Sequence, residues 1–259
     1  DADRPCLVAV EDRPHAIVAS LARPEKCNAI SLDVIADLEA LVRDLHLSRT
    51  TRPFVLRGSG RWFSSGGDLR QFAELTSGEA VEMADRMAGV LRGIEALPGP
   101  TVAALNGPAI GGGVELALAF DLRVAVDSAY LHFAETRMGI ITGWQGVERL
   151  SRLVGYSVCL SLMLTASRVP AGEARRLGLV NAVWPAETFD AELNAFTGEL
   201  VAAGPAGLAV KQVLRRSQTH PGLSSGEMER ELLRALWDRP QRQTAMRESV
   251  QSRNRANVV

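Results

Sequence analysis

The feature that most restricts the fold of this chain is a glycine-rich turn between two apolar segments. The turn spans residues 106–113 and contains four glycines; a strand-like run, 101–105, precedes it and a helix-like run, 114–119, follows it. Glycine permits positive φ and lets a ligand approach the main chain closely. The first N–H groups of a helix lack intrahelical partners and carry the positive end of its dipole. The segment therefore predicts a main-chain site for negative charge, with close helix–strand packing as the simpler alternative.

The sequence around this turn restricts which negative charge it could hold. Gly107 is followed by Pro108, Ala109 and Ile110, so no G-x-G-x-x-G motif is present, and the Gly-Lys-Ser/Thr of a P-loop is also missing. A developing oxyanion suits such a turn as well as a phosphate does. Glu115 stands two residues after the glycines, in the first turn of the expected helix. An acid beside an anion site indicates a reaction site.

Composition excludes several classes of function. The 259 residues carry a formal net charge of −1, which gives no general electrostatic reason to bind nucleic acid or an anionic membrane. The three cysteines form no C-x-x-C pair, and the four histidines are scattered, so a metal site is not expected. We find no signal-peptide pattern and no uncharged apolar run of about 18 residues. These features predict a cytoplasmic protein without metal, nucleic-acid or membrane partners.

Strand-like and helix-like segments alternate along the first half of the chain. The expected strands are 8–10, 16–21, 54–57, 101–105 and 122–126, and the expected helices include 32–45, with Ser31 as N-cap, and 79–97. Such alternation is typical of β-α-β units and predicts a largely parallel sheet. After residue 171 one strand pattern remains, at 179–183, and helices are expected at 188–202, 206–216 and 225–237.

A second glycine turn, at 66–68, also follows an expected strand. If the fold brings it to the turn at 111–113, each turn can contribute one backbone N–H to a common oxyanion. Loss of one such donor typically costs about 3–4 kcal/mol of transition-state stabilisation. Two donors would stabilise an enolate or a tetrahedral oxyanion formed from a thioester or ester carbonyl.

These two turns carry a family resemblance. Residues 63–69 (FSSGGDL) and 106–117 (NGPAIGGGVELA) closely resemble the two signature segments of the enoyl-CoA hydratase/isomerase (crotonase) superfamily, and the similarity continues at 23–29, 134–140, 164–166 and 174–180. The resemblance covers nearly the whole chain. It implies the α/β ββα-repeat spiral core of the ClpP/crotonase fold at residues 1–190. It also implies a C-terminal helical region at 191–259, for oligomerisation and to cover the pocket.

The resemblance also implies an activity and its residues. Gly67 and Gly112 match the oxyanion-hole amides, and Glu115 and Glu135 fall where the hydratases have their two catalytic acids. The implied reaction is that of a lyase of fatty acid metabolism, which adds water to a 2-enoyl-CoA thioester. Without the family, Glu115 is an ordinary acid at a helix N-terminus and Glu135 a solvated loop residue.

Coenzyme A would enter as part of the substrate, with no separate cofactor. The contacts implied by the resemblance are Lys26, Asn28, Ala29, Gly66, Asp68 and Lys211, with Arg23 a further candidate for a CoA phosphate. Each of the basic side chains could equally be a solvated surface charge. Relatives of this kind are homotrimers or dimers of trimers, and the amphipathic segment 225–237 suits a subunit interface or intramolecular packing.

One segment departs from the hydratase pattern and leaves the net reaction open. Hydratases usually have Pro-x-x-Gly-Gly after the segment matching 139–141, whereas this chain has Thr-Gly-Trp-Gln-Gly at 142–146. Trp144 could narrow the acyl pocket or simply pack. Residues 229–240 and 138–141 resemble malonyl-type CoA decarboxylases. Decarboxylation, enoyl-CoA isomerisation and a non-catalytic acyl-CoA- or RNA-binding scaffold are the alternatives.

A serine hydrolase is disfavoured. Ser64 and Ser65 look like nucleophiles, but no histidine occurs in a recognisable partner motif to act as their base.

Overall fold

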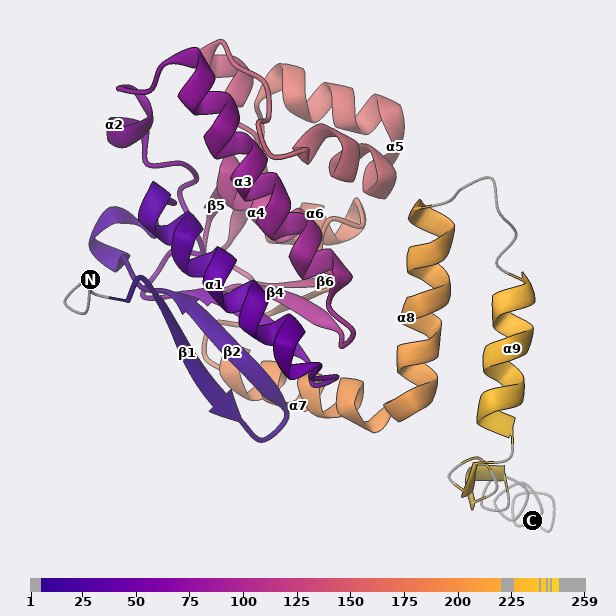
Figure 1. Ribbon diagram of the computed structural model, residues 1–259. Coiled ribbons are helices and arrows are strands. Elements are labelled where there is room, and N and C mark those ends of the chain that lie inside the picture. The colour runs from indigo at the N-terminus through magenta and orange to yellow at the C-terminus, as the bar shows by residue number, and fades with distance from the viewer. Residues whose placement is uncertain (1–5, 220–225, 238, 241, 243, 247–259) are drawn as a thin grey trace. The chain divides into compact units, whose positions relative to one another are not determined.

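A computed structural model describes residues 6–219, 226–237, 239–240, 242 and 244–246 of the chain (Figure 1). The chain divides into two compact units, Asp1–Val201 and Ala202–Val259. Helix α7 (Phe189–Ala202) ends the first unit, so the expected boundary at residue 190 falls at the start of this helix. The second unit contains α8 (Gly204–Thr219) and α9 (Gly226–Trp237), which contact each other. These helices match the predicted ones within a few residues.

A six-stranded, mostly parallel sheet forms the centre of the first unit. Its order is β1-β2-β3-β4-β6-β9, and only the β1–β2 hairpin at one edge is antiparallel. The strands are β1 (Val8–Arg13), β2 (Ala16–Leu21), β3 (Phe54–Gly58), β4 (Thr101–Leu105), β6 (Leu122–Val126) and β9 (Ala182–Trp184). All five residues of β4 are buried, as expected for a central parallel strand covered on both faces. The prediction of a largely parallel sheet is confirmed.

A second, three-stranded sheet was not predicted. It has the order β5-β7-β8, built from β5 (Ala109–Ile110), β7 (Tyr130–His132) and β8 (Arg168–Pro170). The predicted strand at 179–183 is shifted, because the amides of Leu179 and Val180 donate to Ala174 O and close the preceding helix; β9 begins only at Ala182.

Helices α1 (Leu32–Ser48) and α3 (Ser77–Ala96) lie side by side and contact each other (Figure 1). Ser31 caps α1 as predicted, since its hydroxyl accepts the Val34 N–H at 3.3 Å. The remaining helices of this unit are η1 (Pro24–Lys26), α2 (Leu69–Phe72), α4 (Gly112–Leu118), η2 (Glu135–Met138), α5 (Gly146–Thr165) and α6 (Ala171–Arg176). None of the helices in the described ranges is long and apolar enough to cross a membrane.

The parallel pairing of β3 with β4 positions both glycine turns. Their register aligns Phe54 with Thr101 and Arg57 with Ala104, so both strands end at the same edge of the sheet. The connections that follow are joined by Asn106, whose Oδ1 accepts the Gly58 N–H at 2.8 Å and whose Nδ2 donates to Gly60 O at 2.9 Å. Both glycine turns therefore follow strands that end at the same edge of the sheet.

Candidate active site

Main-chain hydrogen bonds bring the two glycine turns together. The Ile110 N–H donates to Ser64 O at 2.9 Å, which joins the segment 64–68 to β5. On its other side this segment pairs with Ile30, whose N–H donates to Gly66 O at 2.8 Å and whose carbonyl accepts the Asp68 N–H at 2.9 Å. The segment 64–68 and β5 are more than 40 residues apart in the sequence, yet they lie side by side just before α4.

The close approach requires glycine. A Cβ on Gly66 would lie 2.6 Å from Ile110 O and 3.1 Å from the Gly112 nitrogen, and Gly66 has a φ of +90°. Gly111, the N-cap of α4, has a φ of +52°. These are conformations and distances that a side chain would not tolerate. The glycines predicted to form an anion site therefore also hold the two turns in contact.

Gly67 and Gly112 each leave an N–H available. Alternate residues of an extended segment point their N–H groups to opposite sides, so the bonds of Gly66 and Asp68 with Ile30 direct the Gly67 N–H away from Ile30. Gly112 is the first residue of α4, where N–H groups lack helical acceptors. Within the described residues, neither N–H donates to another part of the chain. Such a pair can stabilise a developing oxyanion.

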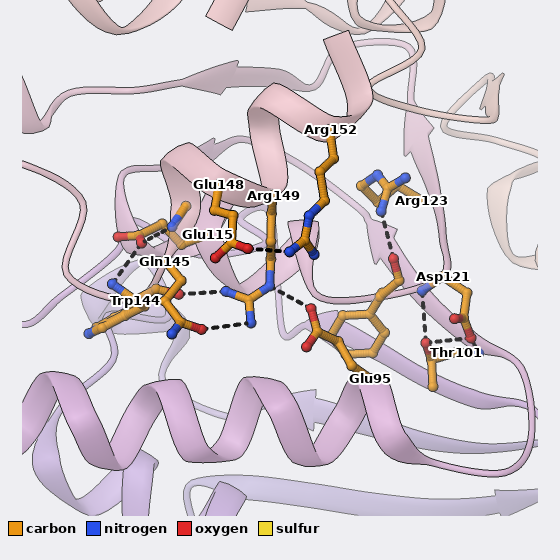
Figure 2. A network of polar contacts seen from close by, with 12 residues as sticks. Glu95, Thr101, Glu115, Asp121, Arg123, Trp144, Gln145, Glu148, Arg149 and Arg152 are labelled. Atoms are coloured by element: carbon orange, nitrogen blue, oxygen red, sulfur yellow. Dashed lines mark hydrogen bonds and ion pairs between the residues drawn. The ribbon is translucent and has the colours of Figure 1, made fainter. Parts of the chain in front are cut away.

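Glu115 is buried and held by two amides. It lies in the first turn of α4 with 3% of its surface exposed, and its Oε2 accepts the N–H groups of Trp144 at 2.8 Å and Gly146 at 2.9 Å (Figure 2). Burial raises the pKa of Glu115 from 4.5 to about 7; the nearby carboxylate of Glu135 adds to this effect, and the two amide bonds oppose it. Glu115 can therefore gain or lose a proton near neutral pH.

Glu135 is equally buried, but no described residue donates a hydrogen bond to its carboxylate. It is the first residue of η2, with 4% exposed, and neither of its carboxylate oxygens has a hydrogen-bond partner among the described residues. Burial raises the pKa of this carboxyl. Its Oε1 would lie 3.6 Å from a Cβ on Gly111, whose carbonyl accepts the Glu115 N–H. The two acids predicted from the sequence thus flank the same turn.

The segment that departs from the hydratase pattern wraps around Glu115. The ring of Trp144 packs on the main chain of Gly112, where an added Cβ would lie 2.2 Å from it, and only 4% of Trp144 is exposed. Gly146 packs against Glu115, since a Cβ there would lie 2.6 Å from Glu115 Cγ. These contacts were not predicted from the sequence. Arg149, which donates to Trp144 O, was also not predicted, because one arginine in an amphipathic helix has no sequence pattern that marks it as buried.

The residues expected to contact CoA differ in what they can offer. Asn28 is buried, and its side chain binds the main chain of Arg23, Ser59 and Trp62. Asp68 forms a 2.9 Å ion pair with Arg23, both buried. The side chains of Asn28 and Asp68 are therefore engaged within the protein, and their N–H groups donate to Arg23 O and Ile30 O.

The other candidates lie in three different settings. Lys26 is exposed, whereas Ala29 and Gly66 lie in the paired segments beside the turns. Lys211 is half-buried on α8, in the second unit.

Ser64 has a structural role. Its buried hydroxyl donates to Asn28 O at 2.8 Å and accepts the Gly66 N–H at 3.2 Å. Two histidines bond elsewhere: His46 to Gly93 O and His132 to Ala166 O. In the part of the chain that the structure describes, no group of His, Cys, Asp and Glu could hold a metal ion.

Comparison with known proteins agrees with this geometry. The family profile described as enoyl-CoA hydratase/isomerase matches residues 14–255. Crotonyl-CoA hydratase of Syntrophomonas wolfei is 32% identical over 219 residues, which are 84% of this chain and 83% of that protein.

Solved structures agree as well. The crystal structure of an enoyl-CoA hydratase from Bacillus anthracis superimposes with a TM-score of 0.87 and 28% identity, covering 95% of this chain and 96% of that one. A structure from Thermobifida fusca in complex with acetoacetyl-CoA gives a TM-score of 0.78 and 28% identity, covering 89% and 94%. The chain has the crotonase fold and belongs to the enoyl-CoA hydratase/isomerase family.

Proposed function

We propose that this protein is an enoyl-CoA hydratase, a lyase that adds water to a 2-enoyl-CoA thioester through an enolate. The observation that carries the proposal is the pair of equally buried carboxylates with unequal partners, beside the N–H groups of Gly67 and Gly112, which donate to no acceptor in the described part of the chain. Hydration needs one group to take a proton from water and another to give a proton to Cα. Carboxyls in different environments suit these two roles.

The hydrogen bonds suggest which carboxyl does which. Two amide donors favour the ionised form of Glu115, whereas neither carboxylate oxygen of Glu135 has a hydrogen-bond partner among the described residues. Ionised Glu115 would take a proton from water as the hydroxyl adds to Cβ, and the thioester oxygen would become an enolate oxygen bound by the N–H groups of Gly67 and Gly112. Protonated Glu135 would then give its proton to Cα. Exchange with solvent would restore both carboxyls.

Coenzyme A enters this scheme as part of the substrate. The acetoacetyl-CoA complex of the Thermobifida fusca relative supports an acyl-CoA ligand for a site of this shape. We propose main-chain contacts from Asn28, Ala29, Gly66 and Asp68 through their carbonyl oxygens, each of which can accept a second hydrogen bond. The exposed ammonium of Lys26, with Lys211 as a further candidate, would meet CoA phosphates.

A second reaction through the same enolate is favoured by one observation, the substituted segment 142–146. Thr142 and Gln145 stand where the usual pattern has its proline and first glycine, and Trp144 between them covers Gly112. That change beside the oxyanion site keeps malonyl-type decarboxylation and enoyl-CoA isomerisation as candidates. A non-catalytic scaffold is less well supported, because both acids are present and buried beside the turns.

The test is turnover of crotonyl-CoA in water. Loss of the conjugated-thioester absorbance, with the product identified by mass as the 3-hydroxyacyl-CoA, is the expected result. No loss in a folded protein that binds CoA would rule out hydration of this short substrate. A 3-enoyl-CoA and a malonyl-type CoA, assayed in parallel, then separate isomerisation from decarboxylation.

The oligomeric state stays a prediction of a homotrimer or a dimer of trimers. Leu233 and Trp237 on α9 are 54% and 48% exposed in the single chain, which supports a subunit interface on this helix. The mass of the assembly in solution tests it.

A further inference from the structure

A buried arginine anchors the loop that holds Glu115. Arg149, in the first turn of α5, has 6% of its surface exposed. Its Nη1 donates to Trp144 O at 2.6 Å, its Nη2 reaches Gln145 Oε1 at 3.5 Å, and its Nε donates to Glu95 Oε1 at 2.7 Å (Figure 2). Glu95 lies near the end of α3, and its side chain is 26% exposed. One guanidinium thus joins the loop to two helices.

The same loop residue contacts Glu115 from its other end. The carbonyl of Trp144 accepts from Arg149, while the N–H of Trp144 donates to Glu115 Oε2. Gln145, which lies between Trp144 and Gly146, has a φ of +68°, an unfavourable value for a residue other than glycine. A backbone in such a conformation persists only where its surroundings hold it. Arg149 contacts the strained residue and the residue before it, since its guanidinium bonds to Trp144 O and reaches Gln145 Oε1 and its N–H donates to Gln145 O at 3.3 Å.

We propose that Glu95 and Arg149 form a positioning pair, which holds the 144–146 loop so that its two amides face the carboxylate of Glu115. Neither side chain needs to touch the substrate. Glu95 orients the guanidinium, the guanidinium orients the Trp144 carbonyl, and the loop amides orient Glu115. The kinetic part of this inference rests on the proposed hydratase function, but the effect on Glu115 itself does not.

The direction of the effect follows from the groups that face Glu115. Glu135 of η2 is the titratable neighbour that acts on it directly, and it raises the pKa; the amides of the 144–146 loop lower it. Arg149 reaches Glu115 only through the loop. Loosening the loop removes the interactions that favour the ionised carboxylate, so the pKa of Glu115 should rise above its value in the parent.

Three variants test the pair. Arg149→Met removes the guanidinium, Glu95→Gln removes the charge that orients it, and Arg149→Lys keeps the charge without the fork of donors. The matched control is Arg152→Met, since Arg152 is on the same helix but forms an exposed i,i+4 pair with Glu148 (Figure 2). The primary readout is the titration of the Glu115 carboxyl by ¹³C NMR of glutamate-labelled protein. Its signal is assigned by its loss in Glu115→Gln.

We expect the midpoint of the Glu115 titration to move upward by at least half a pH unit in Arg149→Met and Glu95→Gln, and by less in Arg149→Lys. The kcat for hydration of the enoyl-CoA substrate should fall tenfold or more in Arg149→Met, and KM should stay within about threefold of the parental value. Arg152→Met should match the parent in both. An unchanged Glu115 titration in folded Glu95→Gln and Arg149→Lys would overturn the proposal.

The two readouts separate this inference from the proposed function. If the parent does not hydrate enoyl-CoA but the variants shift the Glu115 titration as expected, the positioning pair is supported and the hydratase assignment is wrong. If the parent hydrates enoyl-CoA and the variants match it in both titration and turnover, the hydratase assignment is supported and the positioning pair is wrong.

Discussion

Glu115 and Glu135 are buried to the same degree, at 3% and 4% exposure, yet the chain surrounds them differently. Glu115 projects from a helix and accepts two amides of a loop that Arg149 and Glu95 anchor. Glu135 begins a short 3₁₀ helix, and neither of its oxygens has a partner in the described residues. The protein thus binds one oxygen of the Glu115 carboxylate and, among the described residues, neither oxygen of Glu135.

This difference explains how two acids of the same type can take opposite roles. Burial raises the pKa of both carboxyls, so burial alone would make them alike. The amide donors separate them by favouring the ionised form of Glu115 only. Hydrogen bonding, rather than depth, would then decide which is the base and which the acid.

The largest expected effect comes from removing each acid. Glu115→Gln and Glu135→Gln keep the shape of the side chain but remove its proton chemistry, and each should lower kcat on crotonyl-CoA by about 10³-fold, as general acid–base groups typically contribute 10²–10⁴-fold. Steady-state kinetics with both variants measures this loss, with CoA binding as the control for an intact site. If Glu135→Gln kept more than a tenth of the parental kcat, the unpartnered carboxyl would be a bystander and the comparison would fail.

A smaller effect concerns folding stability, and it does not depend on any substrate. The pKa of Glu115 is raised from 4.5 to about 7 in the folded chain. The stabilisation from its neutral form is therefore complete below pH 4.5 and is lost as pH rises through about 7. The full shift corresponds to about 3 kcal/mol as an upper figure. Glu135, with a raised pKa as well, acts in the same direction.

Urea unfolding between pH 5 and pH 8 measures this term. The parent should lose stability over that range, and Glu115→Gln should lose less, because the amide carbonyl can still accept the bonds of Trp144 and Gly146 without a charge to bury. Parallel stability curves for the two proteins would mean that Glu115 is not a buried acid of raised pKa.

Much of this site could be predicted from the sequence because its signals are local. Glycine turns after strands and an acid in the first turn of a helix are read directly from residues such as Gly112 and Glu115. Glu135 was different, since its position in a loop resembles that of a solvated acid, and only the family resemblance singled it out. Burial of a loop residue depends on what covers it, and that is not encoded nearby.

The remaining features depend on contacts between distant segments. Arg149 and Glu95 are 54 residues apart, and neither lies in a motif. The strands β5, β7 and β8 have two or three residues each, too few for an alternating pattern. Arg23 and Asp68, both considered as contacts for CoA, form a buried ion pair, and no spacing rule predicts which arginine pairs with which acid.

The smallest effect tests whether the tight fit around Glu115, rather than its charge alone, is needed. Gly146→Ala would place a Cβ 2.6 Å from Glu115 Cγ and 2.8 Å from its Oε2, so the carboxylate must move away from the two amides. The N–H of residue 146 is retained, so only the position of the acid changes. We expect a loss of about tenfold in kcat, since general acid–base catalysis requires the carboxylate within hydrogen-bond reach of the proton it takes.

Gly89→Ala is the control, because nothing lies within 4 Å of a Cβ at this exposed position of α3. Alanine there should leave kcat unchanged and, as a better helix former, favour the fold slightly. Equal kcat values for Gly146→Ala and the control would mean that the enclosing loop does not fix the position of Glu115, and the proposed difference from Glu135, whose oxygens have no hydrogen-bond partner among the described residues, would lose its functional meaning.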